Sequence, residues 1–107
     1  MNEASINHVM AELESGLHLI PAHMHDSVRL YVLHGTPRTG SFLGAILSND
    51  FMGAVGRADD ANAADLKGWA QFLYGYVPGG CYGSPEHVAA WKRDGGLLGH
   101  SKKESAA

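Results

Sequence analysis

The sequence has little of what marks a secreted or membrane protein. Its one cysteine, Cys81, cannot form a disulfide within the chain, which is typical of a reducing compartment. There is no run of about 18 apolar residues, and the N-terminus lacks a basic region followed by an apolar stretch. We therefore expect neither a membrane span nor a signal peptide, and predict a cytoplasmic protein with no membrane partner.

Charge is also sparse. Charged residues make up 18% of the chain, the net charge is −3, and no block of like charge occurs. Proteins that hold nucleic acid through its phosphates need clustered Lys and Arg, so we predict no nucleic-acid partner.

Glycine, in contrast, is abundant, with 14 residues, but the glycines form no repeat that would indicate a collagen-like or low-complexity chain.

The apolar residues recur at helical spacing, and no window alternates strictly as a half-buried strand would. The clearest stripe is Leu66, Trp69 and Leu73. At 107 residues the chain fits one domain. We predict an all-α fold of five or six short helices with Gly/Pro-rich connections, forming a single domain over residues 1–100. Within it, residues 1–20 are expected as an N-terminal extension with a loosely attached helix, and residues 101–107 as a frayed tail.

Residues that favour helix ends support these boundaries. Gly35 can adopt the left-handed conformation that ends a helix over residues 21–34, with Pro21 in its first turn. Asp59 and Asp60 are candidate caps for the longest helix, residues 60–76. Ser84, followed by a proline and a glutamate, predicts the start of a further helix.

The segment from residue 42 to residue 55 is apolar nearly all round. A helix with that character is buried, either in its own domain or against another subunit. Since a short chain has little surface with which to cover such a segment, we predict a homo-oligomer.

Two glycine-rich helix starts are candidate anion sites. Arg38, Thr39 and Ser41 place a guanidinium and two hydroxyls at one helix N-terminus, where free N–H groups favour phosphate. The spacing and lysine of a P-loop are absent, so an ordinary capped helix start is the alternative. Tyr82, which could stack on a base, and Ser84 lie at the second start, where the favoured alternative is that the glycines only turn the chain between two helices. The two starts would hold a nucleotide only if they converge.

Other chemistry is weakly indicated. Arg57 could reach a phosphate or pair with the neighbouring aspartates. His23 and His25 are two apart and would not share a helix face, and one cysteine cannot complete a common zinc set, so we predict no metal and no cofactor. No base and nucleophile are brought together by spacing, so we predict no catalytic residues and a protein that is not an enzyme.

Strings spread over residues 22–98 resemble a family of short proteins encoded in bacteriophages and prophages. They are Arg29, Tyr31-Val32, Gly35, Pro37, Gly40-Ser41-Phe42-Leu43, Ala45, Leu47, Asn49-Asp50, Gly56-Arg57-Ala58-Asp59-Asp60, Asn62, Cys81, Gly83-Ser84-Pro85-Glu86, Trp91 and Gly95-Gly96-Leu97. The elbow around Pro37 departs from the paired prolines of that family. The resemblance implies a small phage accessory protein acting in the host cytoplasm, and many such proteins counter host defence.

Two functions follow as hypotheses. One is a non-catalytic phage anti-defence protein that binds and sequesters a nucleotide-like anionic molecule, a host defence signal, in a pocket of a homo-oligomer. The other is a protein–protein inhibitor or adaptor that acts on a host protein through an apolar helical face. A pocket lined by arginine, hydroxyls and an aromatic favours the first, whereas an exposed apolar patch of several hundred Å² favours the second.

Overall fold

The computed structural model describes the backbone of residues 2–36 and 41–106, and the side chains of residues 2–36 and 42–102. Helices account for most of these residues, and no strand occurs among them. The α-helices are α1 (Glu3–Gly16), α2 (His25–His34), α3 (Ser41–Leu47), α4 (Phe51–Arg57), α5 (Asp60–Ala64), α6 (Leu66–Tyr76), α7 (Pro85–Arg93) and α8 (Gly96–Ala106). Three 3₁₀ turns join them: η1 (Leu17–Leu19), η2 (Ala22–Met24) and η3 (Gly79–Cys81). The predicted all-α class is confirmed.

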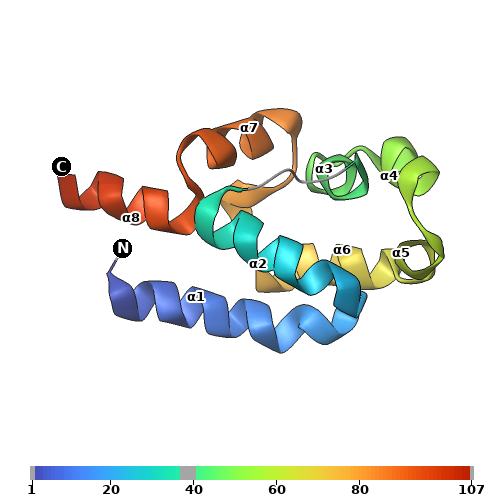
Figure 1. Ribbon diagram of the computed structural model, residues 1–107, viewed down its shortest axis with the longest axis horizontal. Coiled ribbons are helices and arrows are strands. Elements are labelled where there is room, and N and C mark those ends of the chain that lie inside the picture. The colour runs from blue at the N-terminus through green and yellow to red at the C-terminus, as the bar shows by residue number, and fades with distance from the viewer. Residues whose placement is uncertain (1, 37–40, 107) are drawn as a thin grey trace.

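The helices form an elongated body of 43 × 26 × 19 Å. In Figure 1, α1 lies along one long edge and packs against α6, while α2 runs beside them and meets α8. Both chain ends lie at one end of the body, and α4 and α5 lie at the other. None of the helices in the described ranges combines the length and apolar character that a membrane span needs.

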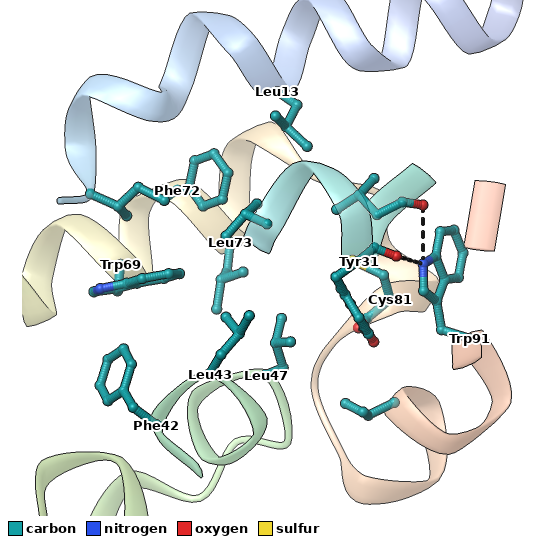
Figure 2. Close-up of a cluster of buried hydrophobic side chains, with 14 of the residues drawn as sticks. Leu13, Tyr31, Phe42, Leu43, Leu47, Trp69, Phe72, Leu73, Cys81 and Trp91 are labelled. Carbon is teal, nitrogen blue, oxygen red and sulfur yellow. Dashed lines mark hydrogen bonds between the residues drawn. The ribbon is translucent and has the colours of Figure 1, made fainter. Parts of the chain in front are cut away.

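An aromatic cluster on α6 forms the centre of the core. Trp69 and Phe72 are fully buried, and the ring of Phe42 on α3 meets Trp69 edge to face at 5.5 Å. Figure 2 shows these rings beside the leucines that α1, α3 and α6 contribute. The Trp69 indole N–H donates to the Oδ1 of Asn62, a buried polar side chain, at 3.0 Å. This packing fixes the rotation of α6, and with it the direction of the α6 face that turns away from the core.

Two long-range hydrogen-bonded contacts tie α2 to the C-terminal part of the chain. The Trp91 indole N–H is shared between the carbonyls of Tyr31 at 3.0 Å and Val32 at 3.2 Å, as Figure 2 shows. The Tyr31 hydroxyl donates to the Cys81 carbonyl at 2.6 Å. Both carbonyls that Trp91 contacts lie in the last turn of α2, where the Tyr31 carbonyl also accepts from the N–H of Gly35 at 2.8 Å. A side chain from α7 therefore helps to end α2.

Several predicted helix ends are confirmed. Gly35 has φ 69° and ends α2, as the left-handed position requires. Asp59 accepts from the N–H of Asn62 and caps α5, and Ser84 accepts from the N–H of His87 and caps α7. The two caps depend on a side chain and a backbone N–H three residues apart, and the end at Gly35 depends on the conformation of that one residue, which is why local sequence was sufficient to predict them.

Other predicted boundaries were wrong. Residues 60–76 form two helices, because the backbone of Asp65 leaves the α-helical region with φ −106° and ψ 21°; its carbonyl accepts from the N–H of Trp69, which starts α6. The helix expected over residues 21–34 begins at His25, because Pro21 has an extended ψ of 142° and leads into a 3₁₀ turn.

The two ends of the chain also differ from expectation. Residues 96–106 are helical as α8, where the sequence predicted a frayed tail from residue 101. The described residues thus hold eight α-helices instead of five or six. Residues 1–20, predicted to be a loosely attached extension, contribute to the core the buried side chains of Leu13, Leu17 and Ile20.

Candidate functional site

The first predicted anion site lies largely outside the described residues. Arg38 and Thr39 fall in the undescribed range 37–40, and Ser41 begins α3 but its side chain is not described. The expectation that these three residues bind a phosphate stays a prediction.

The second predicted anion site is used for structure. The Ser84 hydroxyl accepts from the N–H of His87 at 3.1 Å and lies 3.0 Å from its Nδ1. The N–H of Gly83 donates to the carbonyl of Leu47, the last residue of α3, at 2.8 Å. The glycine-rich turn before α7 therefore contacts the C-terminal end of α3, whereas Ser41 begins the other end of that helix, roughly 10 Å away at 1.5 Å per residue.

Arg57 ends α4 and is exposed. Its Nη1 and the Asp50 carboxylate both lie over Gly53, where the position of an added Cβ would be 2.6 Å from Nη1 and would overlap Asp50 Oδ2. Asp50 Oδ1 also accepts from the N–H of Gly53 at 3.0 Å and so caps α4. Arg57 thus points back along its own helix toward a carboxylate.

The remaining predicted residue, Tyr82, lines a groove between α4 and α6 that the sequence did not predict. The groove has a volume of about 360 Å³. Its lining is mostly apolar, with Ala54 and Leu73 as its buried part and with aromatic side chains at its margin. The residues used in the argument below are Phe51 and Ala54 from α4, Ala70, Leu73 and Tyr74 from α6, and Tyr82.

The groove carries almost no charge. Among the described residues that line it, Asp50 is the one charged side chain, and none is a cation. Asp50 lies at the N-terminal end of α4, where its carboxylate already accepts a capping hydrogen bond. An apolar ligand can therefore enter without displacing a network of ion pairs.

Large apolar side chains stand exposed beside the groove. Tyr74 is 88% exposed, Phe51 68%, Met52 77% and Val55 43%. Phe51 and Tyr74 belong to the groove itself, and Met52 and Val55 continue the exposed surface along α4. Taking about 150–250 Å² for each aromatic side chain and somewhat less for the others, these residues expose on the order of 500 Å². A patch of that size lies in the range of the largest apolar patch on a typical monomer, and such patches are often functional.

Sequence periodicity contained a partial signal for this surface. Tyr74 lies off the stripe that Leu66, Trp69 and Leu73 define, so it could not be buried by the same face of the helix. Phe51 and Met52 gave no such signal, because the segment around them is apolar on every side. Only the packing of α4 against α3 shows which face of α4 stays exposed.

The histidines and the cysteine offer no reactive centre in the part of the chain that the structure describes. No three His, Cys, Asp or Glu side chains gather there to hold a metal. His23 contacts Asp59 at 2.9 Å, whereas His25 contacts the carbonyl of Ile20 at 3.0 Å, so the two point to different partners. Burial raises the pKa of the Cys81 thiol to about 12, which keeps it protonated and poorly nucleophilic near neutral pH.

The groove is consequently the site on which a function can be argued, since it combines concave shape, apolar lining and exposed aromatic margins. The polar clusters already described are occupied by helix capping and by contacts between neighbouring elements. No family model, no curated protein and no solved structure matches this chain, so its function is inferred from the geometry of its own residues.

Proposed function

We propose that this chain is a non-catalytic interaction protein that binds the apolar face of a helix from a partner protein in the groove between α4 and α6. The observation that carries the proposal is the mostly apolar groove, with Asp50 as its one charged residue among those described, flanked by the exposed Phe51 and Tyr74. In the phage setting that the sequence resemblance implies, the partner would be a host protein, and binding would inhibit or redirect it.

The dimensions of the groove suit a helix. Helix-in-groove recognition uses apolar anchors at positions i, i+3 or i+4 and i+7 of the bound helix. A volume of about 360 Å³ lies at the small end of the range for ligand pockets and accommodates one or two such side chains. Phe51 and Tyr74, with rings at the margin, can then close over the anchors and exclude water from them.

The single carboxylate at the groove adds a preference. Asp50 is exposed at the N-terminal end of α4. A lysine or arginine flanking the anchors of the bound helix would share this carboxylate with Arg57 and gain less than the roughly 1 kcal/mol of a full ion pair at an exposed position. We therefore expect the partner helix to carry a basic residue beside its apolar face.

The nucleotide hypothesis receives less support from the described residues. A phosphate needs cations or free N–H groups, and the described lining of the groove has no cation. Tyr82 lies at the groove, but Ser84 is engaged by His87. Sequestration of a nucleotide signal therefore depends on Arg38, Thr39 and Ser41, and it is tested by titrating the protein with cyclic and linear nucleotides.

The test of the proposed function uses designed peptides. One peptide is an amphipathic helix with leucines at i, i+3, i+4 and i+7 and a flanking lysine, and its control has the same composition with the leucines scattered around the helix. We expect calorimetry to give a micromolar Kd for the first and much weaker binding for the second. Backbone resonances of α4 and α6 should shift on binding.

A matched pair of variants locates the binding. Ala70→Glu places a carboxylate on an exposed lining residue of the groove, where a bound helix would cover it and remove its hydration without supplying a partner, so we expect binding to weaken more than tenfold. Gln71→Glu adds the same charge on the same helix outside the lining, and binding should be retained. Equal effects of the two variants, or equal affinity for the two peptides, would overturn the proposal.

A further inference from the structure

The α4 ridge, defined as Phe51, Met52 and Val55, is itself an apolar helix surface of the kind the groove fits. All three side chains are exposed and lie within about one turn of one another. The ridge is uncharged, and the groove beside it has Asp50 as its one charged residue among those described. One molecule therefore carries both an apolar projection and an apolar recess.

A surface that carries both parts can pair with itself. In a twofold dimer the same patch on each copy meets the other, so the ridge of each copy enters the groove of its partner and two identical contacts form. No like charges meet in either contact, because the ridge has none. Gly56 lies beside Met52 one turn along α4, and nothing lies within 4 Å of where its Cβ would be, which leaves room for a second helix to approach.

The available area is consistent with a dimer of modest stability. The exposed ridge and margin amount to on the order of 500 Å² on each copy, as estimated above. A standard interface buries about 800 Å² per partner, and its polar rim supplies part of that. The ridge and groove therefore provide an apolar centre of the right size, and the neighbouring polar residues of α4 and α6 would form the rim.

We infer that the occupant of the groove, in the absence of another partner, is the α4 ridge of a second copy of this chain. This inference rests on the proposed function, because it takes the groove to bind apolar helices. It also gives the groove a regulatory property, since a partner helix must compete with the second copy for the same recess.

The experiment measures mass by analytical ultracentrifugation at tens of micromolar. We expect the native chain to be a dimer. Met52→Glu removes the ridge but leaves the groove, and Ala70→Glu blocks the groove but leaves the ridge. Each variant alone should weaken the dimer by about a hundredfold or more, because it damages both symmetric contacts. Leu30→Glu is the control: it adds a charge at an exposed leucine of α2, outside the ridge and the groove, and should leave the dimer intact.

Mixing the two variants gives the sharper result. In a mixed pair, the intact groove of the Met52→Glu chain can accept the intact ridge of the Ala70→Glu chain, so heterodimers should form at concentrations where each variant alone is monomeric. Circular dichroism confirms that each variant is folded. Failure of the mixture to associate, or dimers that survive both variants, would overturn the ridge-in-groove arrangement.

The two proposals can fail separately. A monomeric native chain that still binds the designed peptide would refute the second copy as occupant and leave the proposed function standing. A dimer that obeys the mixing test but binds no peptide would refute the proposed function as stated. The Met52→Glu variant adds a further check, because it should bind the peptide at least as well as the native chain.

Discussion

Replacing Gly68 by alanine sets two opposed effects against each other within α6. Alanine is about 1 kcal/mol better than glycine in a helix interior, so propensity alone predicts stabilisation. However, the position of an added Cβ at Gly68 overlaps the backbone carbonyl oxygen of Leu19 in η1. A backbone carbonyl cannot rotate away as a side chain can, so either η1 or α6 has to move.

The relative size of these two effects decides whether the substitution stabilises or destabilises the protein. Forcing extra atoms into a packed contact costs typically 1–3 kcal/mol, and a clash with backbone belongs at the upper end of that range. We therefore expect Gly68→Ala to destabilise the protein by roughly 1–2 kcal/mol after the gain in propensity is subtracted. For a domain of this size, that lowers the melting temperature by roughly 5–10 °C.

Gly75 supplies the matched control on the same helix. Nothing lies within 4 Å of a Cβ at Gly75, so alanine there gains propensity without a clash. We expect Gly75→Ala to stabilise by up to about 1 kcal/mol. Thermal and urea denaturation of the two variants should show opposite signs. A Gly68→Ala variant as stable as Gly75→Ala would show that η1 does not approach α6 as closely as described.

Two further predictions concern titration and reactivity. The hydrogen bond from the N–H of Asn62, together with the contact of His23, holds the pKa of Asp59 below its usual 3.8. The Asp59 carboxylate therefore stabilises the fold fully above that pH, and this contribution is lost as the pH falls through the lower pKa of the folded protein. The melting temperature should fall more steeply below pH 4 for the native chain than for Asp59→Asn, and parallel curves would contradict this. Cys81 is fully buried, and its thiol has a pKa of about 12. At pH 8 it should react with a thiol reagent only as fast as the protein opens, whereas in denaturant it should react at the ordinary rate of an exposed thiol. Rapid labelling of the native protein would show that the thiol is accessible.

Local sequence was sufficient to predict a helix end where the chemistry of one residue determines that end. The caps at Asp59 and Ser84 and the left-handed end at Gly35 each follow from the chemistry of one residue and a backbone group nearby. The all-α class followed from the helical spacing of apolar residues in most segments and from the lack of strict alternation.

The sequence was insufficient where contacts with other residues determine a helix boundary or which surface stays exposed. The break at Asp65 accompanies the hydrogen bond from Trp69 to Asn62, which fixes how α6 leaves α5. The groove exists because α4 packs on α3 and leaves a recess beside α6, and nothing local distinguishes the exposed Phe51 from the buried Phe42 nine residues earlier. Of the predicted site residues, the structure places Tyr82 at the groove, engages Ser84 in a cap, and leaves the hypotheses on Arg38, Thr39 and Ser41 as predictions.

The contacts that end α2 have a consequence for synthesis of the chain. Trp91 lies 60 residues beyond Tyr31, and Cys81 lies 50 residues beyond it. At a translation rate of about 5–20 residues per second, roughly 3–12 seconds pass between synthesis of α2 and of the tryptophan that bonds its last turn. During that interval the side chains of Val28, Tyr31 and Val32, buried in the folded protein, remain uncovered by α7 and α8. The nascent chain therefore presents an apolar helix to chaperones until its last quarter has left the ribosome.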